Sequence, residues 1–248
     1  MERFYAEMIS DDVGGNDMFY KYETHSHTAE GSKCGRIDGA SLARLYKSLG
    51  YTGLVITDHF YKGNTAVPRE LPWNEWVTEF VKGYENAKAE GDKIGLDVFF
   101  AWEYSAEYAA DFLIYGLDAN WLYENPDQIQ LGTCAYLTKV REAGGIVIHA
   151  HPFRNPVKML LPEWCDGVEI INANAAEPDN DRAKLYANSY NLRKIAGTDN
   201  HTGIREKMAG VYFTERIVDI HDFADRIKAG EALTFFDRYD KENDFARI

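Results

Sequence analysis

Apolar residues along the chain fall into short continuous runs that alternate with amphipathic stretches. Runs of this kind predict buried strands. They occupy residues 18–27, 52–59, 97–105, 110–118, 145–152, 167–174, 194–201, 209–215 and 231–236. Between them, apolar residues recur at helical spacing. These helical stretches are residues 39–50, 73–90, 126–143, 180–191 and 219–229. The pattern therefore predicts alternating strands and helices.

This alternation predicts a parallel sheet, because parallel strands need a long crossover connection that a helix supplies. The chain has 248 residues, no repeat at a fixed period and no linker-like segment. We therefore expect one domain that spans residues 1–248. With about seven strands of the buried kind, a closed or nearly closed α/β barrel is favoured over an open sheet.

Polar residues gather where the predicted strands end. His25 and His27 are two residues apart, so their side chains point to the same face of the first strand. The other strand ends carry Asp58 with His59, Glu103, His149 with His151, and Asp199 with His201. Six of the seven histidines lie in these positions. In α/β barrels the C-terminal rim of the strands is where active sites form, so we expect one site there.

Histidine and carboxylate donors together indicate a metal site. No cysteine takes part in the repeated pattern, and this donor set suits zinc, manganese or iron. The candidate ligands are numerous enough for two or three divalent ions, provided that one carboxylate bridges them. Glu103 is the predicted bridge, because it stands alone on a central strand.

Five motifs strengthen this interpretation: HSH at 25–27, ITDH at 56–59, WE at 102–103, AHP at 150–152 and GTDNH at 197–201. As a set, over residues 20–240 and in this order, they resemble the PHP family, named for polymerase and histidinol phosphatase. The resemblance implies a distorted (β/α)7 barrel, similar to a TIM barrel, with two or three metal ions that hydrolyse phosphoesters. The ligands implied by motif position are His25, His27, His59, Glu103, His151, Asp199 and His201.

The chain departs from the family pattern in two places. Many members carry another ligand shortly after HxH, where this chain reads TAEGSKCG and offers Glu30 or Cys34 as a substitute. Many also carry a histidine on the strand after the second-motif glutamate. Here Asp111 lies two residues before the matching position and is a further candidate metal ligand. The third ion and the substrate class are therefore open.

In the expected chemistry, two ions about 3.5–4 Å apart clamp a phosphate and lower the pKa of a bridging water, whose hydroxide form attacks phosphorus. The leaving oxygen then needs a proton. The catalytic candidates are Glu103 as the bridge and Asp58, His149 and His201 as proton donors. Arginine and lysine side chains near the rim are expected to bind the substrate phosphate. These are Arg154, Lys33, Arg36 and Lys62.

Composition bears on the partners and the compartment. The net charge of −13 argues against broad binding to a nucleic-acid backbone, so we expect a small phosphorylated substrate and no long nucleic acid. Cys34, Cys134 and Cys165 are few and unpatterned, which indicates a reducing compartment. Residues 1–12 carry no apolar signal core, and no run is long enough to span a bilayer. We therefore expect a cytoplasmic protein with no membrane partner. The oligomeric state is open.

Alternative interpretations stay open. His149 also fits a core histidine, Asn172 and Asn174 fit hydrogen bonding within the barrel, and His221 is expected at the surface. The first functional interpretation is hydrolysis of a small phosphate monoester. A phosphodiesterase or exonuclease acting on nucleotides or short oligonucleotides is the alternative. An amidohydrolase-like enzyme or a non-catalytic metal-binding module is a further one, although amidohydrolase barrels usually bridge their ions with a lysine that has no counterpart here.

Overall fold

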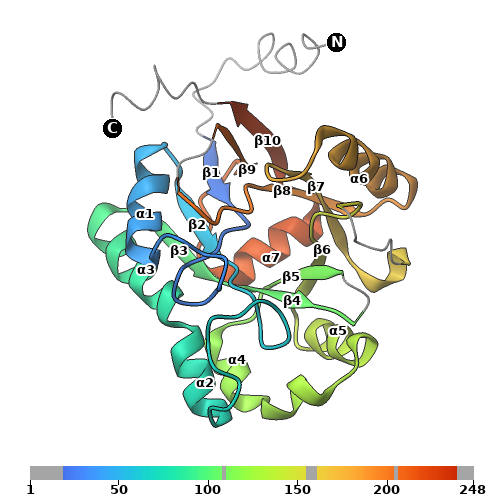
Figure 1. Ribbon diagram of the computed structural model, residues 1–248. Coiled ribbons are helices and arrows are strands. Elements are labelled where there is room, and N and C mark those ends of the chain that lie inside the picture. The colour runs from blue at the N-terminus through green and yellow to red at the C-terminus, as the bar shows by residue number, and fades with distance from the viewer. Residues whose placement is uncertain (1–18, 108–109, 155–160, 204–205, 239–248) are drawn as a thin grey trace, which may run out of the picture.

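The computed structural model describes residues 19–107, 110–154, 161–203 and 206–238. Within these ranges, ten strands form two five-stranded sheets (Figure 1). The first sheet contains β1 (Tyr20–Glu23), β2 (Gly53–Ile56), β3 (Asp97–Phe100), β9 (Lys207–Phe213) and β10 (Leu233–Arg238). The second sheet contains β4 (Trp102–Ser105), β5 (Asp111–Tyr115), β6 (Ile146–His149), β7 (Gly167–Asn172) and β8 (Arg193–Gly197). The strands lie where the apolar runs predict them.

Seven α-helices and two short 3₁₀ helices connect the described strands. The α-helices are α1 (Gly39–Ser48), α2 (Trp73–Phe80), α3 (Lys82–Ile94), α4 (Ala119–Glu124), α5 (Thr133–Glu142), α6 (Glu177–Ser189) and α7 (Ile220–Ala229). The 3₁₀ helices are η1 (Pro126–Gln130) and η2 (Pro162–Trp164). The single helix expected over 73–90 is therefore two helices that meet at Val81. The one expected over 126–143 is α-helical only from Thr133, because its first five residues form η1.

Both sheets are mixed, whereas the alternation of strands and helices predicted a parallel sheet. The strand orders are β10-β9-β1-β2-β3 and β4-β5-β6-β7-β8. β1, β2 and β3 run parallel, as do β6, β7 and β8, but β5 is antiparallel to both of its neighbours and β9 to both of its own. Residues 106–110 are too few for a parallel crossover, so β5 must return antiparallel beside β4.

The prediction of a closed or nearly closed (β/α)7 barrel is wrong. The apolar run 97–105, expected as one strand, is interrupted at Ala101, so β3 ends the first sheet and β4 begins the second. Within the described residues, isolated bridges such as His59 with Glu103 and Ser26 with Asn200 connect the strand ends of the two sheets. Both of these bridges lie among the polar residues expected at the strand ends. Two open sheets, not a closed barrel, therefore bring the site residues together.

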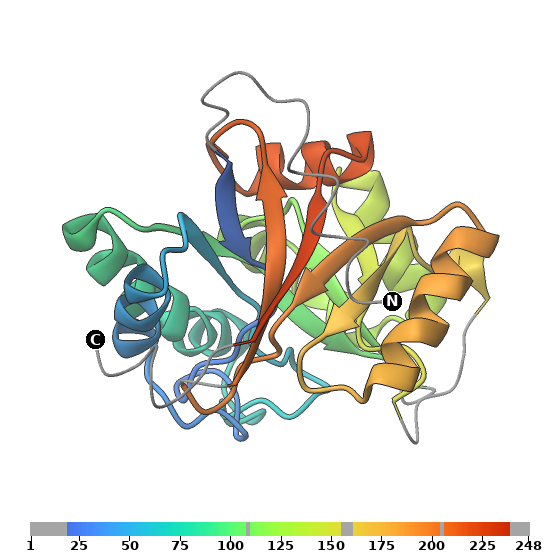
Figure 2. The same cartoon turned by 90° about the horizontal axis from the view of Figure 1, so that it is seen from above.

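The hydrophobic core lies between and around the sheets. One buried cluster joins side chains from both sheets, such as Tyr22 and Ile148, with Phe223 of α7. Helices α1 and α6 lie on opposite flanks of the strands (Figures 1 and 2). Gly83 in α3 allows this helix to approach the loop after β1, because a Cβ there would lie 2.1 Å from Oγ1 of Thr28. The core thus fixes the loops that carry the polar residues.

Residues 1–12, expected to carry no signal core, lie outside the described residues. None of the helices in the described ranges has the length and apolar character needed to cross a membrane.

Candidate metal centre

Three chain segments that follow strands place their side chains at one point between the sheets. His25 and His27 follow β1, and their Nε2 atoms lie 3.1 Å apart, as expected for neighbours on one face of an extended segment. Asp199 follows β8, and its Oδ1 lies 3.5 Å from Nε2 of His25 and 3.3 Å from Nε2 of His27. His151 follows β6, and its ring stacks on that of His25. All four side chains are buried.

Glu103 lies within β4, one residue after its start, and its carboxylate faces four imidazoles. Oε1 lies 2.9 Å from Nε2 of His151 and 3.7 Å from Nε2 of His25. Oε2 lies 2.8 Å from Nδ1 of His59 and 3.4 Å from Nε2 of His27. The two oxygens of one buried carboxylate thus serve different pairs of histidines, which is the arrangement that the predicted bridging role requires.

Three overlapping groups of side chains place donor atoms within 4.8 Å of one another. These groups are His25, Glu103 and His151; His25, His27 and Asp199; and His27, His59 and His201. A tetrahedral ion with ligands at about 2.1 Å separates neighbouring ligand atoms by about 3.4 Å. Several of the distances around His25 and His27 are close to this value. In addition, Oε2 of Glu103 and Nδ1 of His59 are buried and face each other at 2.8 Å, but neither atom makes a hydrogen bond of good geometry. The donor set and its spacing therefore fit divalent metal ions.

Hydrogen bonds fix which nitrogen of three histidines is free to bind a metal. Nδ1 of His25 lies 2.9 Å from the Glu169 carboxylate, and Nδ1 of His201 lies 2.8 Å from the carbonyl oxygen of Asp199. Because these oxygens only accept hydrogen bonds, both Nδ1 atoms carry the proton. Oγ of Ser32 donates its hydrogen to Asp58 and can therefore only accept from His27. Nδ1 of His27 lies 3.2 Å from Oγ of Ser32, so this nitrogen also carries a proton and donates it. The Nε2 lone pairs of all three rings are then available to a cation.

The charges of the site are strongly coupled. Burial opposes protonation of His25, but Glu169, Asp199 and Glu103 outweigh burial and raise the pKa of this imidazole well above its usual value. Burial and the neighbouring His59 lower the pKa of His27 to about 3. The pKa values of Glu103 and Asp199 are held well below normal by the histidines, against the effect of burial. The carboxylates therefore stay ionised and stabilise positive charge among them.

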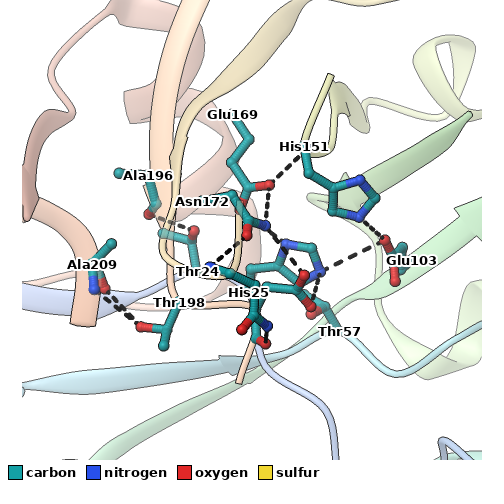
Figure 3. A network of polar contacts seen from close by, with 12 residues as sticks. Thr24, His25, Thr57, Glu103, His151, Glu169, Asn172, Ala196, Thr198 and Ala209 are labelled. Carbon is teal, nitrogen blue, oxygen red and sulfur yellow. Dashed lines mark hydrogen bonds and ion pairs between the residues drawn. The ribbon is translucent and has the colours of Figure 1, made fainter. Parts of the chain in front are cut away.

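Glu169 is a functional residue that the sequence analysis missed (Figure 3). It is fully buried within β7, and Oε1 accepts the hydrogen bond from Nδ1 of His25. Oε2 accepts from the backbone amide of His151 at 2.8 Å and from Nδ2 of Asn172 at 2.9 Å. One carboxylate therefore orients two of the candidate ligands. The signal in the sequence was an acid inside the apolar run GVEII.

Glu23 is the second missed residue. It is fully buried at the end of β1, and Oε1 accepts hydrogen bonds from the backbone amides of Thr24, His25 and Thr198. Oε2 accepts from the hydroxyl of Tyr46 at 2.7 Å. Burial raises the pKa of this carboxyl to about 7. Glu23 ties the segment after β1 to the segment after β8, which together supply His25, His27 and Asp199.

Two of the three predicted proton donors, Asp58 and His149, lie outside the ligand groups found among the described residues. Both oxygens of Asp58 accept hydrogen bonds from the loop after His27, including Oγ1 of Thr28 at 2.6 Å. Burial raises the pKa of Asp58 to about 6. His149 is buried against Phe112, and burial together with His151 lowers its pKa to about 3. This environment favours the core-histidine interpretation of His149. His201 is the third candidate and lies at the partly exposed side, next to Asp199.

Three residues were considered as substitutes for missing family ligands: Glu30, Asp111 and Cys34. Their surroundings differ. Glu30 accepts hydrogen bonds from the amide of Gly39 and from Nδ2 of Asn86, and so supports α1 and α3. Asp111 is in none of the three ligand groups found among the described residues. Burial and the negative charge of Glu103 raise the pKa of Asp111. Cys34 is also in none of these groups; burial opposes its ionisation, but His201 and His59 lower its pKa to about 6.

Of the four basic side chains predicted to bind phosphate, all of them in the described part of the chain, Arg154 is the one that contacts a candidate ligand. Its Nη1 lies 3.0 Å from Oδ2 of Asp199, and the side chain is 39% exposed. Lys33 and Arg36 are exposed in the loop after β1. Lys62 donates to the carbonyl of Leu131, away from the ligand groups. Asn172 and Asn174 each donate a hydrogen bond from Nδ2 to an oxygen of Asp199. His221 is exposed on α7, as predicted.

Backbone in the left-handed region is concentrated at the candidate metal centre. Four non-glycine residues in the described chain have positive φ, and three of them are His151, Phe153 and Asp199, with φ of 30°, 70° and 53°. Such conformations cost free energy and persist where the surrounding structure holds them. Two of the three are candidate ligands, so the fold maintains strain where it aims these side chains.

Comparisons with known proteins bear on the fold. No family model matches the chain, and no curated protein matches it. Among solved structures, it is similar to a two-domain protein "containing predicted PHP-like metal-dependent phosphoesterase" from Bacteroides vulgatus. The TM-score is 0.64 at 15% identity, over 88% of this chain and 65% of that one. It is also similar to PsfC from Pseudomonas syringae, with a TM-score of 0.58 at 14% identity over 92% and 95% of the two chains. The resemblance expected from the motifs is thus confirmed at the level of the fold.

A third similar structure corrects the expectation about partners. Endonuclease Q, in complex with a 27-mer duplex that has an abasic lesion at the active site, matches with a TM-score of 0.62 at 12% identity. The match covers 86% of this chain and 57% of Endonuclease Q. The exclusion of long nucleic acid was wrong, because it used net charge alone. A fold of this kind accommodates DNA in a longer protein, and overall charge does not describe the local field around a site with bound cations.

Proposed function

We propose that this chain is a metal-dependent phosphoester hydrolase of the PHP type. The observation that carries the proposal is the position of Glu103, whose two carboxylate oxygens face separate histidine pairs. His25, His27, His151 and Asp199 complete the inner ligands, and His59 and His201 lie on the partly exposed side. Divalent ions bound to these residues supply Lewis-acid charge to phosphoryl oxygens and lower the pKa of bound water.

The residues of the chain have three tasks around those ions. Glu169 and Glu23 hold the ligand segments in place from the buried side through the hydrogen bonds described above. Arg154 reaches the site from the exposed side, where its guanidinium binds a phosphate oxygen and gives up part of its contact with Asp199. The burial of the inner ligands keeps bulk solvent away from them and strengthens the charge interactions there.

Within this class, the first substrate to test is a small phosphate monoester. Its support is Arg154 beside Asp199, since one guanidinium and the metal ions suffice to hold one terminal phosphate. A second candidate is a phosphodiester of DNA, which the shared fold with Endonuclease Q favours. The two substrates differ in the number of ester bonds at phosphorus, so one pair of model compounds separates them.

The test measures the metal content of purified protein by elemental analysis, together with hydrolysis of p-nitrophenyl phosphate and of its bis-ester. A DNA duplex with and without an abasic site is assayed in parallel. We expect at least two ions per chain and monoester turnover that a chelator abolishes. His27→Ala is expected to lose metal and activity together and to keep its circular dichroism spectrum. Turnover of the bis-ester or of DNA alone would transfer the proposal to a phosphodiesterase. Full activity of protein without metal would refute it.

A further inference from the structure

Tyr46 connects helix α1 to the segments that carry the candidate ligands. It is fully buried on this helix, and its ring packs edge-on against that of Tyr51, with 4.8 Å between the ring centroids. The hydroxyl of Tyr46 donates to Oε2 of Glu23 at 2.7 Å and accepts from Nδ2 of Asn200 at 3.2 Å. One phenolic oxygen therefore lies between the end of β1 and the segment after β8.

The direction of each hydrogen bond in this chain follows from Asn200. Its Oδ1 accepts from the backbone amides of Thr202 at 3.1 Å and Gly203 at 3.0 Å. Two amide donors identify this atom as the oxygen, so the other end of the side chain is the NH₂ group, which donates to the Tyr46 hydroxyl. The hydroxyl then directs its own hydrogen to Glu23. A single order of donors and acceptors thus runs from α1 to the turn after the second ligand segment.

Asn200 lies in the sequence between two candidate ligands, Asp199 and His201. Its backbone carbonyl accepts from the amide of His27 at 2.9 Å, and its side chain holds the turn that follows His201. His201, with His27 and His59, forms the outer of the three ligand groups. Asn200 is fully buried, so bulk solvent cannot replace a hydrogen-bond partner that its side chain loses. A change at this side chain should therefore reach the outer ligand group.

The inner ligands have supports that do not involve Tyr46. Oε1 of Glu23 accepts from three backbone amides, which hold the segment after β1. Oδ2 of Asp199 accepts from Nη1 of Arg154 at 3.0 Å and from Nδ2 of Asn172 at 3.3 Å. These contacts remain when the Tyr46 hydroxyl is removed, so the inner ligand groups should keep their geometry.

We infer that Tyr46 is a positioning residue of the metal centre, which acts from α1 through Asn200 on His201. The inference rests on the proposed function, because it requires that the outer ligand group binds an ion. Without the hydroxyl, Nδ2 of Asn200 has no acceptor, and the side chain is free to turn away from the amides that it holds. The ion at His201 should then bind more weakly, while the ions at the inner groups stay bound.

The experiment compares Tyr46→Phe with Tyr22→Phe. Tyr22 is the matched control, because its buried hydroxyl also donates to a carboxylate, that of Asp97 at 3.2 Å, and accepts from an N–H group, the amide of Ile217 at 2.9 Å. Neither partner contacts a ligand segment. Metal-free full-length protein is titrated with zinc in competition with a chelator of known affinity, and elemental analysis counts the bound ions. Urea denaturation of each variant is measured in parallel.

Both phenylalanine variants should lose stability, because each leaves buried groups without a partner. Tyr46→Phe alone should weaken one bound zinc ion, by about 10- to 100-fold, and saturating zinc should restore its full set of ions. Asn200→Ala interrupts the same chain of hydrogen bonds from the other end and leaves α1 unchanged. We expect it to weaken the same ion, and the double variant to bind zinc no more weakly than Asn200→Ala, because both changes interrupt one connection.

The outcomes separate the inference from the proposed function. A wild type that binds zinc, with equal zinc affinity in Tyr46→Phe and Tyr22→Phe, would overturn the role of Tyr46 and leave the metal centre intact. Additive losses in the double variant would do the same. If Tyr46→Phe does not fold by circular dichroism, unchanged zinc affinity in Asn200→Ala would overturn the inference. If the wild type binds no metal ion, both the inference and the proposed function fail.

Discussion

The carboxylate of Glu169 lies 2.9 Å from Nδ1 of His25, and both side chains are fully buried. The same carboxylate accepts the backbone amide of His151 through its other oxygen. A carboxylate behind a metal-binding histidine fixes the tautomer of the ring and raises its basicity. Glu169 in the apolar strand β7 therefore leaves Nε2 of His25 free to bind an ion.

Replacing Glu169 with glutamine should reverse the tautomer of His25. The amide oxygen of the new side chain is needed by two donors, the amide of His151 and Nδ2 of Asn172. Its NH₂ group must then face Nδ1 of His25 and donate to it, which transfers the ring proton to Nε2. We expect metal affinity to fall about 10- to 100-fold. Competition with a chelator of known affinity measures this change.

The control for this variant is Glu142→Gln on the exposed side of α5, which removes the same charge far from the histidines. Its metal affinity is expected to equal that of the wild type. An unchanged affinity in Glu169→Gln, in protein with a native circular dichroism spectrum, would show that the hydrogen bond to His25 has no part in metal binding.

Glu103 and His201 should differ in how many ions depend on them. Glu103 contacts both the inner pair His25 and His151 and the outer residue His59, whereas His201 belongs to the outer ligand group alone. We therefore expect Glu103→Ala to lower the metal content by more ions per chain than His201→Ala. Elemental analysis after removal of loosely bound metal provides the count. Glu107→Ala, exposed shortly after β4, is the matched control. An equal loss in the two site variants would contradict the bridging position of Glu103.

The sequence predicted the position of the candidate site better than the shape of the fold. His25, His27, His151, Asp199 and their partners could be found because each follows an apolar strand, and parallel strands end at a common edge. The sheet break at Ala101 could not be found, since residues 98–102 around it, VFFAW, are continuously apolar and contain no turn residue. The decision between a closed barrel and two sheets depends on long-range pairing, which periodicity does not record.

The orienting residues were harder to find for another reason. Glu169 and Glu23 are single acids within or beside apolar segments, and their roles depend on donors that come from distant parts of the chain. A buried carboxylate needs such donors, because burial without them is costly. The presence of an acid in GVEII therefore predicts a polar partner, but the sequence does not name His25 as that partner. Only the packing of β7 beside the end of β1 does so.

His149 should make the metal-free protein less stable in acid. Burial lowers its folded pKa to about 3, below the ordinary value near 6.5. The folded state therefore favours the neutral ring, and stability is fully present above pH 6.5 and is lost as the pH falls toward 3. A cation bound nearby would also disfavour the protonated ring and so lower the pKa of His149 further. Between pH 7 and pH 5 this group alone should cost about 2 kcal/mol of the free energy of unfolding.

Urea denaturation of metal-free wild type and His149→Gln at the two pH values measures this contribution. The wild type is expected to lose more stability than the variant by about 2 kcal/mol, because glutamine does not titrate. His221→Gln on the exposed face of α7 should behave as the wild type does. Equal acid sensitivity in wild type and His149→Gln would mean that His149 is protonated in the folded protein.

Arg154 should determine how tightly phosphate binds. Its guanidinium is partly exposed and paired with Asp199, so it can contact a phosphate while it stays at the metal centre. A charged hydrogen bond of this kind contributes about 1.5–3 kcal/mol, which corresponds to about 10- to 100-fold in affinity. We therefore expect Arg154→Ala to raise KM for a phosphate ester and to weaken inhibition by inorganic phosphate by this factor. Metal content should not change, because Arg154 is not a ligand.

Arg154→Lys tests the geometry of the contact. Lysine keeps the charge but lacks the planar pair of donors that matches two phosphate oxygens, so it should restore only part of the affinity. Arg44→Ala is the matched control, since Arg44 is an exposed arginine of α1 that pairs with Glu90 far from the site. If Arg154→Ala instead lost metal ions and kept its phosphate affinity, the side chain would serve only to hold Asp199 in place.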